Sequence, residues 1–218
     1  MHDLPALEAP LHRRTALSVS AALLAAAPLL SACSGQARPG TAAVVGGERI
    51  TTSALQAQVG DVRAAQNESG PTAAQLIQAS PGLERVKLNK MIQTVVLERA
   101  AKDAGVSVGE KEVQDFRKAQ LEKAGGSEKL AAAALEQAQL APGQLDADAR
   151  FKLLRDKLFD HYGSQDKAVE KLASAAKALH IEVNPRYGVW DAQQIVLGDQ
   201  DTPWIVQRTR PEQAPAGA

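Results

Sequence analysis

The residue with the most distinctive chemistry in this chain is Cys33, its only cysteine. A thiol is a strong nucleophile, and two small residues stand directly before it. An apolar run over residues 16–30 comes before those, and Arg13 and Arg14 precede the run. A basic segment, an apolar stretch of about 7–15 residues and small residues at a cleavage site form the order of a secretory signal. The sequence therefore predicts a signal peptide over residues 1–32.

The segment Leu30-Ser31-Ala32-Cys33 resembles the lipobox of bacterial lipoproteins. In that family a diacylglycerol is attached to the cysteine sulfur, the chain is cut before the cysteine, and the new N-terminus is acylated. The resemblance implies that palmitate-type chains on Cys33 anchor the protein to the extracytoplasmic face of the cell membrane. A transmembrane anchor with an incidental cysteine and a core cysteine are the alternatives, but the apolar run is shorter than the ~20 residues of a spanning helix. The Arg13-Arg14 pair leaves twin-arginine export open beside Sec export.

The charge balance limits the classes of partner. The chain has 25 Lys and Arg residues and 25 Asp and Glu residues. Two of each sign fall within residues 1–32, so the remaining chain is neutral as well. Proteins that bind the phosphate backbone need a basic surface. We therefore expect no nucleic-acid partner.

Hydrophobic periodicity predicts a mainly α domain over residues 43–197. It follows a flexible tether at 33–42 and precedes a tail at 198–218 that we expect to be disordered. Strands are expected over 43–50, broken at Gly46-Gly47, and at 181–183 and 195–197. A small β-hairpin or ribbon made from the Val44 and Val183 regions would then join the two ends of the domain. Helices are expected at residues 53–66, 72–79, 83–104, 110–123, 130–140, 143–162 and 166–180, with 83–104 at the centre of the core.

Three segments together resemble the N-terminal domain of the SurA and PrsA chaperone group. Residues 44–51, Val-Val-Gly-Gly-Glu-Arg-Ile-Thr, are similar to the opening strand and helix start of that family, although Gly46 replaces its usual asparagine. Residues 95–113 resemble its junction between a long helix and an acidic helix start. Residues 181–191, Ile-Glu-Val-Asn-Pro-Arg-Tyr-Gly-Val-Trp-Asp, resemble the closing segment of actinobacterial members. The resemblance covers about residues 43–191.

This resemblance implies an extracytoplasmic holdase that binds unfolded or nascent exported polypeptides, without a cofactor. In the family a parvulin prolyl isomerase domain is inserted between the two parts of the helical domain. Here only residues 163–165 separate two predicted helices, which leaves no room for it. His161 and His180 are the histidines after residue 32, and each stands near a predicted helix end, where a capping or dipole role is expected. We therefore expect no enzyme activity and no metal site.

A holdase needs exposed apolar surface. The large side chains expected on the wall of a peptide groove are Met91, Phe116, Leu154, Leu158 and Phe159. Each of them also fits an ordinary core position, which is the alternative for every one.

A second motif lies near the end of the domain. Its residues, which we interpret as a structural turn rather than as a peptide grip, are Asn184, Pro185, Arg186, Tyr187, Gly188 and Trp190. The function predicted from the whole sequence is a membrane-anchored holdase. The alternative is a lipoprotein adaptor that uses the same fold to dock one specific envelope partner, and a degenerate enzyme is a third, weaker interpretation.

Overall fold

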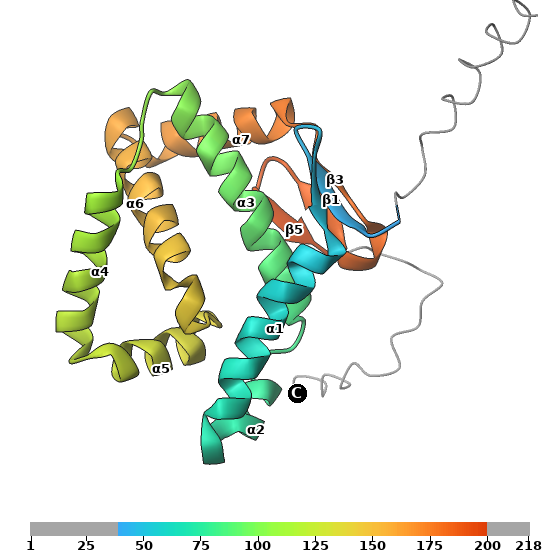
Figure 1. Ribbon diagram of the computed structural model, residues 1–218. Helices are drawn as coiled ribbons and strands as arrows, with labels where there is room; N and C mark the ends of the chain where they lie inside the picture. The colour runs from blue at the N-terminus through green and yellow to red at the C-terminus, as the bar shows by residue number, and fades with distance from the viewer. Residues whose placement is uncertain (1–38, 200–218) are drawn as a thin grey trace, which may run out of the picture. The chain divides into compact units, whose positions relative to one another are not determined.

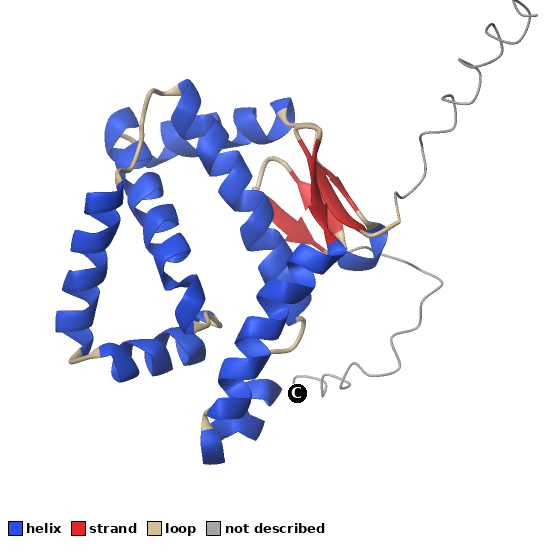
Figure 2. Ribbon diagram, viewed as in Figure 1, coloured by secondary structure: helices blue, strands red, loops and turns tan. Residues whose placement is uncertain are grey.

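The computed structural model describes residues 39–199, and Figure 1 shows their path. The described chain is mainly helical, with small antiparallel sheets, which confirms the predicted fold class. Figure 2 shows the strands gathered on one side of the helices. The α-helices are α1 (Thr52–Glu68), α2 (Ala73–Gln78), α3 (Leu83–Asp103), α4 (Glu110–Ala124), α5 (Ser127–Ala138), α6 (Leu145–Tyr162) and α7 (Gln165–Ala178). Short 3-10 turns are η2 (Gly70–Thr72), η3 (Pro142–Gln144) and η4 (Pro185–Tyr187).

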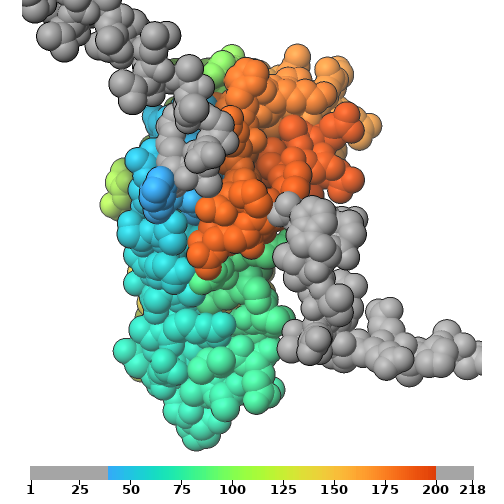
Figure 3. Space-filling view, turned by 90° about the vertical axis from the view of Figure 1, so that its right-hand side faces the viewer, coloured from blue at the N-terminus to red at the C-terminus, as the bar shows by residue number. Residues whose placement is uncertain are grey.

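The first sheet joins the two ends of the domain. Strands β1 (Thr41–Val45) and β2 (Glu48–Thr51) form a hairpin, and β3 (Glu182–Val183) pairs with the other edge of β1. The register places Ala43 opposite Val183. This arrangement confirms the expected ribbon, and the space-filling view shows the N-terminal and C-terminal segments in contact on one face (Figure 3).

The hairpin turn is tied to the end of α7. Gly46 has a φ of 60°, a left-handed conformation that glycine adopts without steric cost. Its backbone N–H donates to the carbonyl oxygen of Leu179 at 2.7 Å. A Cβ at this position would lie 2.6 Å from Leu179 Cδ2. A side chain at position 46 would therefore make the Leu179 side chain move, which favours glycine where the family resemblance leads one to expect asparagine.

A second ribbon, made of β4 (Val189–Asp191) and β5 (Val196–Gly198), lies against α3. The Leu197 N–H donates to Asn89 Oδ1 at 2.8 Å, and Gln93 Nε2 donates to the Ile195 carbonyl oxygen at 2.8 Å. Amide side chains of α3 therefore satisfy backbone groups of the ribbon. The expected strand at 195–197 corresponds to β5, whereas β4 is an addition to the predicted elements.

Helix α3 is the centre of the core, as its apolar stripe predicts. Leu88, Ile92 and Val96 are fully buried, and α3 packs against α1, α6 and α7. Gly105 follows the helix with a φ of 67°, a left-handed conformation that is common for a glycine after a helix end. Full burial of one such side chain contributes about 1.5–3 kcal/mol, so these three residues account for a large part of the packing around α3.

The limits of the domain differ slightly from the predicted ones. Thr41 and Ala42, expected in the tether, belong to β1, and Ala42 has no exposed surface.

None of the helices within residues 39–199 is long and apolar enough to cross a bilayer. The predicted signal peptide, Cys33 and the tail beyond Asp199 lie outside the described residues.

Candidate functional site: a pocket beside the central helix

A pocket of about 320 Å³ lies between α1, α3 and the segment that runs from Leu140 through η3 into the first turn of α6. Its apolar wall is formed by Ile50, Met91, Val95 and Leu140. Met91 is half-buried and contributes an unbranched thioether side chain, which adapts to apolar groups of different shapes. The wall can therefore accept an apolar side chain without a single fixed shape.

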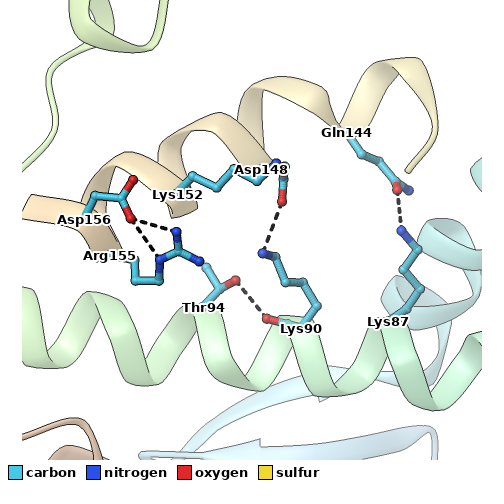
Figure 4. A network of polar contacts seen from close by, with 8 residues as sticks. All are labelled: Lys87, Lys90, Thr94, Gln144, Asp148, Lys152, Arg155 and Asp156. Atoms are coloured by element: carbon cyan, nitrogen blue, oxygen red, sulfur yellow. Dashed lines mark hydrogen bonds and ion pairs between the residues drawn. The ribbon is translucent and has the colours of Figure 1, made fainter. Parts of the chain in front are cut away.

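The polar part of the lining comes from α3, η3 and α6, and Figure 4 shows how these side chains meet. Lys87 Nζ donates to Gln144 Oε1 at 2.7 Å. Lys90 Nζ lies 3.2 Å from Asp148 Oδ1, and Lys152 Nζ lies 2.8 Å from Asp148 Oδ2. One carboxylate thus serves two ammonium groups, while the third ammonium contacts a neutral amide.

Gln144 is held in place from both sides. Its Nε2 donates to the Gln58 carbonyl oxygen at 2.9 Å, so its Oε1 faces Lys87 as an acceptor. Only 7% of Gln144 is exposed. This side chain therefore connects α1, α3 and the start of α6, and it fixes the polar end of the pocket.

The charges of the polar wall are shifted by burial. Burial lowers the pKa of Lys87 to about 8, although the charge of Asp148 opposes the shift. Burial likewise lowers the pKa of Lys90 against the same carboxylate. Burial acts to raise the pKa of Asp148, but the hydrogen bond from Lys152 and the charge of Lys90 outweigh it and lower the pKa. At neutral pH Lys87 therefore still carries its proton, and the lowered pKa of Asp148 favours its carboxylate form.

Lys90 is also positioned by an aromatic ring. Its Nζ lies 3.2 Å from the centroid of the Phe151 ring, in a cation–π contact. The contact and the Asp148 ion pair together hold the Lys90 ammonium over α6. Lys87, one turn earlier on the same side of α3, has neither kind of partner among the described residues.

The structure separates the five groove candidates. Met91 lines the pocket. Leu154 and Leu158 are 8% and 0% exposed and belong to the core cluster, so they do not present their side chains on an open groove. They are buried because α6 packs this face against α3 and α7. Phe116 on α4 and Phe159 on α6 are half-buried, and neither lines the pocket beside Met91.

The motif at the end of the domain forms η4 and the start of β4. Asn184 Oδ1 accepts from the Arg186 N–H at 3.2 Å, Tyr187 is 2% exposed, and Gly188 has a φ of 126°. Pro185 occupies the first position of the 3-10 turn, and Trp190 packs against the core.

Arg186 and Tyr187 also line a second, more polar hollow of about 440 Å³. The Arg186 guanidinium lies 4.9 Å from the centroid of the Tyr187 ring. Arg63 and Arg85 reach the same hollow, but both donate to backbone carbonyl oxygens of the domain. These contacts give the arginines a structural role at this end of α3.

The polar wall of the first pocket was not among the predicted site residues. Lys87 is 5% exposed although it lies on a helix whose other buried positions are apolar. Asp148 similarly stands beside Leu145 and Ala149 on the buried side of α6. A charged residue at a buried helical position is a signal that the sequence contains, but only the packing shows that Lys87, Gln144 and Asp148 meet.

Within residues 39–199 no group of three His, Cys, Asp or Glu side chains is placed to hold a metal ion. The His161 ring instead makes an edge contact with Tyr162, at 5.0 Å between centroids.

The described residues form a mainly helical domain that is closed by a ribbon of its two ends and has a partly apolar pocket beside charged side chains. A model of the family described as the SurA-like N-terminal domain matches residues 14–159, which is more than half of the 218 residues. The chain belongs to this family. No parvulin domain was detected. No curated protein and no solved structure matches the chain.

Proposed function

We propose that this protein is a membrane-anchored extracytoplasmic holdase that binds unfolded exported proteins without catalysis. SurA-like domains bind unfolded proteins, and membership of that family supports a chaperone-type role. The observation that carries the proposal is the pocket beside Met91, which combines an adaptable apolar wall with charged side chains. Such a pocket accepts one apolar side chain of an extended chain at a time, so binding is weak and general.

The pocket can be tested by filling it. Ala147 is an exposed residue of α6 that lines the pocket, and a tryptophan there would occupy the space beside Met91. Ala119 is an exposed alanine of α4 outside the pocket, so Ala119→Trp is the matched control. We expect the purified wild-type chain and Ala119→Trp to suppress the aggregation of several unrelated unfolding proteins, and Ala147→Trp to lose most of that effect.

Equal suppression by Ala147→Trp and Ala119→Trp would contradict the assignment of this pocket. A wild-type chain that ignores every unfolding protein, yet retains one native envelope partner, would instead establish the adaptor alternative. Circular dichroism spectra and thermal midpoints of the two variants show whether either substitution perturbs the fold.

We further propose that the lipid on Cys33 supplies the anchor. Covalent lipidation contributes about 0.8 kcal/mol per buried CH2, and more than one chain is needed for stable attachment. Cells given radiolabelled palmitate should label the wild-type chain but not Cys33→Ala. The Cys33→Ala chain should also leave the membrane fraction or keep its uncut leader. Unchanged labelling of Cys33→Ala would refute this part of the proposal.

A further inference from the structure

The buried ammonium of Lys87 has spare hydrogen-bonding capacity. A lysine has three N–H donors, and buried charges are usually paired. Lys87 is 5% exposed, and among the described residues its Nζ has one hydrogen-bond acceptor, the neutral Gln144 Oε1. The nearest acidic group on α6, Asp148, is already bound by Lys90 and Lys152. The polar wall therefore has more positive charge than its own carboxylate neutralises.

Charged groups from each neighbouring element act on Lys87. They are Lys90 on α3, Asp148 on α6 and Asp61 on α1, while the neighbouring β2 and η3 residues at the pocket, Ile50 and Gln144, carry no charge. Three lysines, counting Lys152, face two carboxylates, which leaves one net positive charge. A ligand with one carboxylate complements this wall.

The apolar and cationic parts of the pocket have a defined spacing. Lys87 and Met91 are four residues apart on α3, so their Cα atoms are about 6 Å apart along the helix axis. In an extended polypeptide, side chains two residues apart point to the same side and are about 6.5–7 Å apart. One face of an extended segment can therefore place one side chain at Lys87 and the next at Met91.

We propose that this pocket selects extended client segments that carry a glutamate or aspartate and, two residues away on the same face, a large apolar side chain. The carboxylate accepts the free N–H groups of Lys87, and the apolar side chain packs on Met91, Val95 and Leu140. The proposal rests on the polypeptide-binding function proposed above and gives it a sequence preference.

The test uses fluorescent nonapeptides with blocked ends and measures the Kd for the whole chain by anisotropy. One peptide has glutamate and leucine two residues apart, a second has glutamine in place of the glutamate, and a third has glutamate and leucine at adjacent positions. We expect the first peptide to bind about tenfold more tightly than the other two at pH 7, because a charge-assisted hydrogen bond exceeds a neutral one. The preference should fade as the pH rises above about 8, where Lys87 loses its proton.

A variant assigns the effect to Lys87. Lys87→Met keeps the length of the side chain and removes the charge, and it should bind the glutamate and glutamine peptides equally. Lys102→Met removes an exposed lysine from the last turn of the same helix and should keep the wild-type preference. Far-UV spectra of both variants establish that they are folded.

Three outcomes overturn the proposal: equal binding of the glutamate and glutamine peptides by the wild type, a preference that persists in Lys87→Met, or equal binding of the spaced and adjacent peptides. A peptide with a free C-terminal carboxylate that outcompetes the end-blocked one would also overturn it, in favour of chain ends as ligands. Aggregation suppression by the wild type without any peptide preference refutes this inference and leaves the holdase function standing.

Discussion

Lys87 makes a quantitative prediction about the stability of the domain. Its pKa is about 8 in the folded protein, against an ordinary value of 10.5, because burial disfavours the ammonium. Below pH 8 the group is protonated in both the folded and the unfolded chain, so the full cost of burying the charge is present. Between pH 8 and 10.5 the unfolded chain holds the proton and the folded chain does not, so the free energy of unfolding rises with pH.

The size of this rise follows from the shift. A difference of 2.5 pH units, from 10.5 to 8, corresponds to about 3 kcal/mol at 1.36 kcal/mol per unit. The wild type must be compared with Lys87→Met, so that the difference reports on this one side chain. The free energy of unfolding of the wild type minus that of Lys87→Met should increase by about 3 kcal/mol between pH 7 and 11.

The assay is urea unfolding, followed by circular dichroism, at half-unit steps from pH 7 to 11. Lys102→Met, measured in parallel, corrects for the general effect of removing one positive charge from an exposed site on α3. A difference between wild type and Lys87→Met that stays flat over this range would show that the ammonium is well solvated. Lys87 would then have little need of a carboxylate from a ligand.

Three further changes test the packing and the pocket, each by urea unfolding. Leu158→Ala should cost about 2–5 kcal/mol, since this fully buried α6 side chain leaves a cavity in the core. Asp148→Asn should lower the free energy of unfolding by about 1–3 kcal/mol at pH 7, less than for a fully buried ion pair because Lys90 and Lys152 are partly solvated. This loss should become smaller as the pH falls through the lowered pKa of Asp148. Gly188→Ala should cost about 3 kcal/mol, because φ is 126° and a Cβ would meet the Gly198 carbonyl oxygen. As a control, Gly163→Ala should cost about 1–2 kcal/mol, because φ is 62° and the space around that position is open.

Local patterns were sufficient to predict much of this fold. The stripe over 83–104 predicts the buried central helix because 3.6-residue periodicity reports directly on which face is apolar. The Gly46-Gly47 pair predicts the hairpin turn, and the resemblance of both chain ends to one family predicts that β1 and β3 belong together. The break at Gly125-Gly126 and a capping residue at Ser127 predict where the alanine-rich helix begins, and α5 begins at Ser127.

Strand β4 is the part of the second ribbon that pattern alone did not predict, whereas β5 was expected at 195–197. Strands β4 and β5 have three residues each, too few to show an alternation of apolar and polar side chains. The Leu197 N–H of β5 and the Ile195 carbonyl oxygen just before it bind Asn89 and Gln93, which are more than 100 positions away in the sequence. Such contacts depend on tertiary packing, so the residues of the ribbon do not record them.

Tertiary packing also decides which of the predicted groove residues lie at a pocket and which lie in the core. Large apolar residues on an amphipathic helix fit a core and a groove equally well, and only the packing of α6 against α3 and α7 buries Leu154 and Leu158. Met91 instead lines a pocket whose other lining residues include Gln144 and Asp148, which contact Lys87 and Lys90 of the same helix. The same pocket thus places polar side chains that the core could have replaced with apolar ones beside an apolar wall that stays accessible.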